Sequence, residues 1–210
     1  MSQRISFLTC ILNHMITSQQ VHALRAKTGL GMMDCKKALE EAKGDEEKAI
    51  EILRKKGFAK AGEKASRTAA QGLVLSYIHS NQKVGSLIEV NCETDFVART
   101  DDFQNFCRDL AMNVTAANPI YLSPSEVPAE LLDKETEIYT EQIKNEGKKP
   151  EIVKQIVDAK LKKFTEEVSL LTQPFIKNTD ITIEQYVKEM VSKTGENIQI
   201  KRFARFSLNA

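Results

Sequence analysis

The side chains with potential chemistry are few: four cysteines, three histidines and one glycine-rich segment. None of the cysteines forms a C-x-x-C pair, and His14, His22 and His79 lie at no zinc-ligand spacing from them, so no metal site is expected. In a chain of 210 residues, four cysteines indicate free thiols in a reducing compartment. The cysteines are Cys10, Cys35, Cys92 and Cys107.

The segment Gly57–Lys64 is a near miss for a phosphate-binding loop. That loop requires a lysine and a hydroxyl residue directly after its second glycine, so that they reach the phosphates and a magnesium ion. Here Glu63 occupies the lysine position and Ala65 follows Lys64. The segment also follows a predicted helix, whereas the motif follows a strand. We therefore expect no nucleotide site in this chain.

The acids Glu93 and Asp95 could bind a metal ion, but acids where a strand leaves a sheet are far commoner. Cys92 ends a predicted strand without an adjacent base, so a buried or edge thiol is expected and not a nucleophile. His79 lies beside a predicted turn, where it should be solvated. The sequence thus offers no catalytic constellation and implies no cofactor.

Two short features stand out. Met32 and Met33 follow Gly29–Gly31 at a loop-to-helix junction, where they form either an adaptable contact surface or part of a core. The residues Thr94, Asp95, Phe96 and Val97 lie between a predicted strand and a predicted helix. Asp95 and Phe96 are either a protruding probe or a capping acid beside a core aromatic.

The elements that must position these residues begin with a predicted three-helix bundle at 15–56. Val21 and Leu24 lie on its first helix, and a second helix is predicted from Met33 to Lys43. Asp45 should cap a third helix that ends before Gly57. A basic linker is predicted at 57–70. It overlaps a basic run at 54–67 that has a single acid, Glu63. The cations of this run are Arg54, Lys55, Lys56, Lys60, Lys64 and Arg67.

Residues 71–210 predict an α+β core. Alternation on either side of Ser80–Lys83 predicts a β-hairpin, and Thr100 should cap the helix that follows. The last strand should carry one alternating face, broken only by Phe203: Ile198, Ile200, Arg202, Ala204, Phe206 and Leu208. The order of elements implies a small, mainly antiparallel sheet covered by helices.

The core also contains a charged helical pair at 123–167. Ser123 and Glu126 should form a capping box before a helix that continues from 128 to 145, and Pro150 opens its antiparallel partner. A further capping box at Thr182–Gln185 predicts a helix that ends before Gly195.

Composition limits the class of protein. Hydrophobic residues make up 41% and charged residues 28%, as in an ordinary globular protein. The net charge of +1 excludes a protein that grips nucleic acid by bulk charge alone. No apolar run approaches the roughly 20 residues of a membrane span.

Residues 1–14 are predicted to be a disordered or mispredicted leader, with Met15 as the working start. The alternatives are a poor signal peptide, which would have one cation and no A-x-A cleavage pattern, or a short organellar leader.

Four segments together resemble the elongation factor Ts family of translation factors. Leu24–Leu39 resembles the family's N-terminal signature, and Glu89–Arg99 resembles its second signature. Leu170–Phe175 and Gly195–Ile198 extend the likeness toward the C-terminus. It covers about residues 16–208, with the motifs in the family's order.

The resemblance implies a guanine-nucleotide exchange factor for elongation factor Tu. It implies a UBA-like N-terminal domain and a bacterial cytoplasmic protein, with an organelle stroma or matrix as alternatives. The short form of the family, with one core unit, implies a homodimer. Contacts with the partner's nucleotide domain are implied for Leu24, Arg25, Met32 and Met33. Thr94–Val97 is implied to disturb the partner's Mg²⁺ site, with Phe96 as a wedge.

A ribosome- or RNA-associated protein that uses the basic linker is the alternative. The neutral net charge and the lack of aromatic residues interleaved with basic ones count against it.

Overall fold

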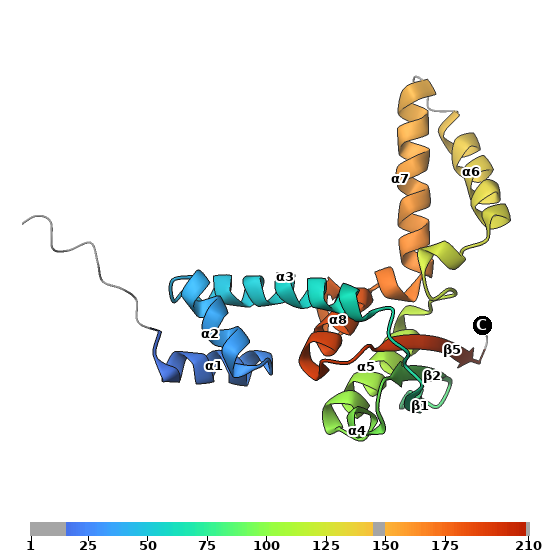
Figure 1. The fold of residues 1–210 in the computed structure, drawn as a ribbon. Helices are drawn as coiled ribbons and strands as arrows, with labels where there is room; N and C mark the ends of the chain where they lie inside the picture. The colour runs from blue at the N-terminus through green and yellow to red at the C-terminus, as the bar shows by residue number, and fades with distance from the viewer. Residues whose placement is uncertain (1–15, 145–149, 209–210) are drawn as a thin grey trace, which may run out of the picture.

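The computed structural model describes residues 16–144 and 150–208. The predicted leader at 1–14 and the end of the helix predicted to reach residue 145 lie outside these residues. The predicted α+β class is confirmed, because helices surround a small antiparallel sheet. Figure 1 shows a helical unit at one end, the sheet with its covering helices at the other, and a pair of helices that projects from the second part.

The N-terminal unit is built from α1 (Ser18–Thr28), α2 (Met32–Glu41) and the first half of α3 (Glu46–Lys64). Asp45 caps α3 as predicted, because its carboxylate accepts the backbone N–H of Lys48. The three helices enclose a core of their own. Its buried members are Val21, Leu24, Cys35, Ala38, Leu39, Ala42, Ala49 and Leu53.

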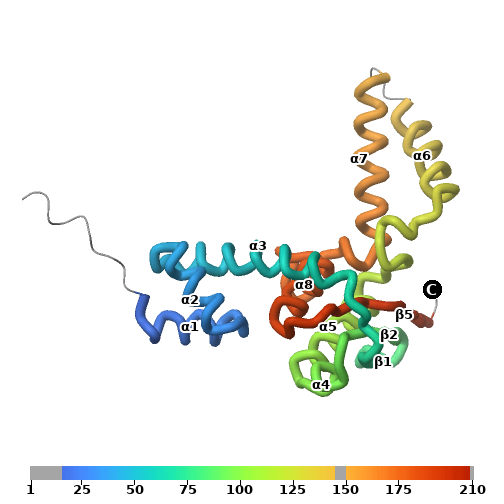
Figure 2. Tube along the Cα trace, in the orientation of Figure 1, coloured from blue at the N-terminus to red at the C-terminus, as the bar shows by residue number. Residues whose placement is uncertain are grey.

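The predicted end of the third helix was wrong. α3 continues through Gly57 to Lys64, so this part of the predicted linker 57–70 is helical, and Figure 2 shows one unbroken coil. Gly57 is needed for packing: a β-carbon there would lie 2.7 Å from the Ser192 hydroxyl oxygen on α8 (Ile183–Thr194). The contact with α8 holds the helix together where the glycine alone would favour a break.

The main sheet has the order β1-β2-β5, with antiparallel pairing throughout. β1 (Gln71–Ile78) and β2 (Val84–Cys92) form the predicted hairpin, and β5 (Gln199–Ser207) is the predicted last strand. The predicted helix, α5 (Asp101–Ala117), is capped by Thr100 and packs against one face of this sheet. Residues that are fully or almost fully buried between them are Ile88, Val90, Phe103, Phe106, Leu110 and Val114.

The prediction that one face of β5 alternates along the whole strand was wrong, because the strand contains a bulge. Val90 pairs with Ile200 but Glu89 pairs with Arg202, so Lys201 is an extra residue. A one-residue shift moves every later side chain to the opposite face of a strand. Ile200 and Phe203 therefore both face the core, while Phe206 lies on the opposite face of the sheet and is 72% exposed.

The charged helical pair consists of α6 (Ala129–Lys144) and α7 (Pro150–Val168), which pack side by side and project from the core (Figure 1). The capping box predicted at Ser123 was wrong. Pro124–Glu126 forms a short 3-10 helix, η1, and the Ser123 hydroxyl lies 2.8 Å from that of Ser125 instead of accepting a backbone N–H. The Glu126 carboxylate accepts the N–H of Leu122, which removes it from the predicted box.

A small unpredicted region joins α7 to α8. It contains a 3-10 turn, η2 (Leu170–Thr172), and a two-stranded sheet of β3 (Pro174–Phe175) and β4 (Asn178–Thr182). The predicted capping box at Thr182 and Gln185 is confirmed, and α8 ends at Gly195 in the left-handed conformation, φ 78°. The division at 15–56, 57–70 and 71–210 and the UBA-like nature of the bundle stay predictions.

Candidate functional site

Phe96 lies on α4 (Asp95–Ala98), a short helix that directly follows β2. Thr94 caps this helix, because its hydroxyl oxygen accepts the backbone N–H of Val97 at 3.4 Å. Val97 packs against the main core and Ala98 is buried in it. Phe96 points away from that core and is 79% exposed. The segment is thus anchored by its second half while its aromatic side chain projects.

This exposure excludes the alternative in which Phe96 is a core residue. Burial of a side chain of this size contributes about 1.5–3 kcal/mol, and the fold of the chain itself gains little of this from Phe96. The neighbouring Asp95 pairs with Arg99 one turn later, at 2.9 Å between Oδ2 and Nη2. Both side chains are exposed, so the ion pair contributes little to the stability of the fold.

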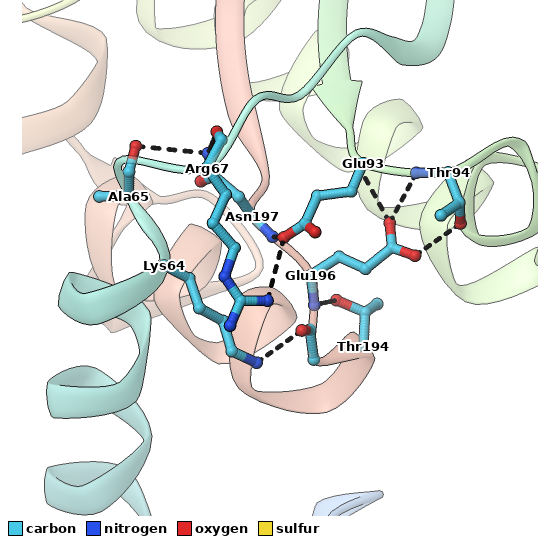
Figure 3. A network of polar contacts seen from close by, with 9 residues as sticks. Lys64, Ala65, Arg67, Glu93, Thr94, Thr194, Glu196 and Asn197 are labelled. Atoms are coloured by element: carbon cyan, nitrogen blue, oxygen red, sulfur yellow. Dashed lines mark hydrogen bonds and ion pairs between the residues drawn. The ribbon is translucent and has the colours of Figure 1, made fainter.

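The start of α4 is held by a carboxylate from a distant part of the chain, shown in Figure 3. Glu196 follows the C-terminus of α8, and its Oε2 accepts the backbone N–H groups of Glu93 and Thr94 at 3.1 and 3.0 Å. Its Oε1 accepts the Thr94 hydroxyl at 2.5 Å. One side chain therefore satisfies three donors at the point where β2 turns into α4.

The same loop also binds the end of α3 (Figure 3). Asn197 donates its side-chain N–H to the carbonyl of Arg67 at 2.6 Å, and its backbone N–H to the Glu93 carboxylate at 2.6 Å. Lys64 donates to the carbonyl of Gly195 at 2.5 Å. The loop at 195–197 therefore connects the long helix α3 to the first residues of α4.

The second predicted contact segment lies at the junction of α1 and α2. Met33 is 62% exposed, and Arg25 is exposed in the last turn of α1. Met32 is half-buried and packs against the bundle core. Leu24 differs from the expectation, because its side chain is fully buried in that core. Leu24 supports the surface from beneath and does not form part of it.

Two cysteines near the candidate site are unsuited to nucleophilic chemistry. Burial raises the pKa of Cys107 to about 12. The pKa of Cys92 is also raised, mainly by burial and to a smaller extent by the negative charge of Glu196. The Cys92 thiol donates to the carbonyl of Thr94 at 3.1 Å. Glu93 and Asp95, considered above as metal ligands, are bound to different partners, Asn197 and Arg99.

Across residues 16–144 and 150–208, no cluster of three or more His, Cys, Asp or Glu side chains could hold a metal ion. Within the same residues, no helix is long and apolar enough to cross a membrane. What the described part of the chain does present is a projecting aromatic residue on an anchored turn and an exposed methionine at a helix start. These features are typical of a protein that binds another macromolecule.

Comparison with known proteins gives the particular family. The family model described as elongation factor TS matches residues 22–210. The chain is 56% identical to the elongation factor Ts of Carboxydothermus hydrogenoformans over 92% of its own length and 89% of that protein. It is 53% identical to the protein of the same name from Heliobacterium modesticaldum, over 92% of its length and 90% of that protein. For the Syntrophus aciditrophicus protein the identity is 52%, over 92% and 96%.

The chain therefore belongs to the elongation factor Ts family. The resemblance found in its sequence signatures is confirmed, and so is the function that this family has in translation elongation, nucleotide exchange on elongation factor Tu.

Sequence reasoning missed the residues that hold the site. Glu196 and Asn197 were recognised as part of a family motif, but no role was assigned to them. The partners of their side chains lie 102 to 132 residues away in the chain. The motif was the available signal, and nothing in its local pattern indicates which segment it binds.

Proposed function

We propose that the chain binds the GDP-bound form of elongation factor Tu and releases GDP by disturbing its Mg²⁺ and phosphate site. GDP is held largely through its phosphates, which Mg²⁺ bridges to protein. A side chain that moves the elements around this ion weakens both contacts. Such exchange requires no covalent chemistry and no cofactor of the factor's own.

The exposure of Phe96 is the observation that carries this proposal. A rigidly based, projecting aromatic residue is suited to enter a gap between two elements of a partner. We assign Phe96 the role of the wedge, and Thr94 and Val97 the role of holding it. Asp95 would place a negative charge beside the metal site, once it leaves its exposed pair with Arg99.

The N-terminal unit would provide a second contact through Arg25 and Met33. Met33 offers a flexible apolar side chain that adapts to a partner surface, and Arg25 adds a cation beside it. Met32 and Leu24 keep the start of α2 in place.

Thermodynamic linkage adds a requirement on the partner. A factor that weakens the binding of GDP to elongation factor Tu must itself be bound less tightly when GDP is present.

Binding of RNA through the basic run of 54–67 is disfavoured by the neutralisation of its cations. Most of them are paired with carboxylates of the same protein, and Lys64 is bound to a carbonyl. Paired cations release fewer counterions on contact with phosphates, which weakens binding. The pairs are Arg54–Glu189, Lys55–Glu51, Lys56–Glu41, Lys60–Asp34 and Arg67–Glu93.

The open face of the sheet supports the proposed homodimer. The face away from α5 carries large apolar side chains that are exposed: Val74, Ile78, Leu87 and Phe206. Leu208 extends this apolar surface beyond the end of β5. A second copy of the chain would bury all of them at once.

We place the protein in the bacterial cytoplasm. Translation elongation takes place there, and the matched relatives are bacterial proteins.

The wedge is tested by the release of fluorescent GDP from elongation factor Tu in stopped flow. Truncation of an anchoring aromatic residue costs about 2 kcal/mol or more, so Phe96→Ala should slow stimulated release roughly thirtyfold at limiting factor concentration. Circular dichroism should show an unchanged fold, because the side chain is outside the core. Wild-type release by a well-folded Phe96→Ala protein would overturn the assignment.

The homodimer is tested by light scattering after size-exclusion chromatography. Phe206→Glu places a charge on the apolar face, on its edge strand β5, and should convert the dimer to a monomer. The matched control is Lys201→Glu, an exposed position in the bulge of the same strand. A wild-type protein that is monomeric at tens of micromolar would refute the homodimer.

A further inference from the structure

The loop that follows α8 carries the Glu196 carboxylate. Among the described residues, its hydrogen-bond donors are Glu93 and Thr94, the two residues that directly precede α4. Glu196 is half-buried and receives three hydrogen bonds, two from backbone N–H groups and one from the Thr94 hydroxyl (Figure 3). Donors bound to a charged acceptor form the strong class of protein hydrogen bonds. The proposed exchange mechanism leaves this residue without a role.

The position of Glu196 is itself fixed by the chain around it. Gly195 adopts the left-handed conformation that reverses the direction of the backbone at the end of α8. The backbone N–H of Glu196 donates to the hydroxyl of Thr194, the last residue of α8, at 3.3 Å. Lys64 binds the Gly195 carbonyl on the other side. The carboxylate is therefore presented from a loop with two further attachments.

Thr94 transmits this restraint to α4. Its hydroxyl donates to Glu196 and its oxygen accepts the N–H of Val97, so a single group joins the carboxylate to the first turn of the helix. A helix of four residues has little stability of its own, and tertiary contacts must set its direction. Phe96 lies two residues after Thr94, so the direction of α4 decides where its ring projects.

We propose that Glu196 is a positioning residue for nucleotide exchange, which fixes the aim of Phe96 through Thr94. The proposal rests on the function proposed above for Phe96. It adds that the C-terminal segment Gly195–Ile198 contributes to exchange without contacting the partner. The fixed base lets Phe96 enter the partner without first ordering the segment, and that ordering would otherwise reduce the rate.

The test is a double-mutant cycle of Glu196→Ala with Phe96→Ala, measured as stimulated GDP release at limiting factor concentration. Glu196→Ala alone should slow release about tenfold, because three donors lose their charged acceptor. In the Phe96→Ala background it should cause almost no further loss, because the residue acts through that ring. Glu196→Gln should recover part of the rate, since its amide oxygen still accepts backbone N–H groups. Glu184→Ala, an exposed carboxylate on α8, is the control and should release GDP at the wild-type rate.

Hydrogen exchange of the backbone amides gives a readout that does not depend on the partner. The N–H groups of Glu93 and Thr94 should exchange at least tenfold faster in Glu196→Ala, while amides of α5 keep their protection. Thr94→Val and Thr94→Ser repeat the test without touching Glu196, should its alanine variant fail to fold. Serine keeps the hydroxyl donor, so the Thr94→Ser protein should stimulate GDP release faster than the Thr94→Val protein.

The outcomes separate the two proposals. Wild-type release by Phe96→Ala would remove the wedge, and with it the basis of this inference. Slow release by Phe96→Ala together with wild-type release by Glu196→Ala would leave the wedge and overturn the role of Glu196. Equal losses from Glu196→Ala in both backgrounds would also overturn it, because Glu196 would then act independently of Phe96. Equal rates for the serine and valine variants of Thr94 would do the same.

Discussion

Gly57 of α3 and Ser192 of α8 lie so close that a β-carbon at position 57 would come within 2.7 Å of the serine hydroxyl oxygen and 3.1 Å of its β-carbon. α3 takes part in both apolar cores, because Leu53 is buried in the N-terminal unit and Ala61 in the main one. The contact between Gly57 and Ser192 therefore helps to determine the position of the N-terminal unit, which carries Met33, relative to the main core, which carries Phe96. In Figure 1, α1 and α4 both lie below α3.

Gly57→Ala should lower the free energy of unfolding by about 1 kcal/mol. Overpacking costs about 1–3 kcal/mol, and the better helix propensity of alanine offsets about 1 kcal/mol of it. Gly62→Ala on the same helix is the matched control, because a β-carbon there has no neighbour within 4 Å. It should raise stability by up to about 1 kcal/mol. Urea unfolding measures both, and equal stabilisation by the two changes would show that the contact with Ser192 is not tight.

Met33→Ser should weaken binding to elongation factor Tu about tenfold without changing the melting temperature. The side chain is exposed in the free protein, so its burial contributes only when the partner is bound. Isothermal titration calorimetry and thermal unfolding separate the two effects.

Met32→Ser is the companion variant and should behave in the opposite way. Its side chain packs against the bundle core, so the change should lower the free energy of unfolding by about 1 kcal/mol and affect affinity less. A drop in melting temperature for Met33→Ser with unchanged affinity would assign Met33 to the core instead.

Glu189→Gln should stabilise the protein at pH 7 and have no effect near pH 4. Burial raises the pKa of Glu189 above its ordinary value of 4.5, and Arg54 at 3.3 Å only partly counteracts this. The folded state therefore binds the proton more tightly than the unfolded state. Stability from this group falls as the pH rises through the ordinary value to the raised one.

The size of the Glu189 effect should be below about 1 kcal/mol, because the ion pair is partly exposed and screened by solvent. Urea unfolding at both pH values measures it. Glu184→Gln serves as the control, since this carboxylate of α8 is exposed beside Lys188. A Glu189→Gln protein that is less stable at pH 7 than at pH 4, relative to wild type, would contradict the predicted sign.

Local signals in the sequence were sufficient for most of the secondary structure. Asp45, Thr100 and Thr182 cap helices as predicted, because a cap requires only a side chain and a backbone N–H three residues later. The hairpin turn and the helix end at Gly195 depend on equally local preferences. The same reasoning was wrong at Ser123, where a neighbouring serine competes for the hydroxyl.

The site followed from the sequence only in part. The family signatures singled out Phe96 and Met33, and the structure exposes both side chains. The signatures did not distinguish them from Leu24, which is fully buried. The exposure of a side chain depends on which other helices pack over it, and a linear motif contains no information on that packing.

The sequence by itself determined the order of the elements, their caps and the family, because these depend on neighbouring residues and on motif identity. Only the tertiary structure decided that α3 passes through Gly57, that β5 shifts its faces at Lys201, and that Glu196 holds Thr94. Each of these three features is set by a segment that is distant in the chain. Contacts between distant segments form only when the whole chain packs, so their consequences cannot be derived from local periodicity.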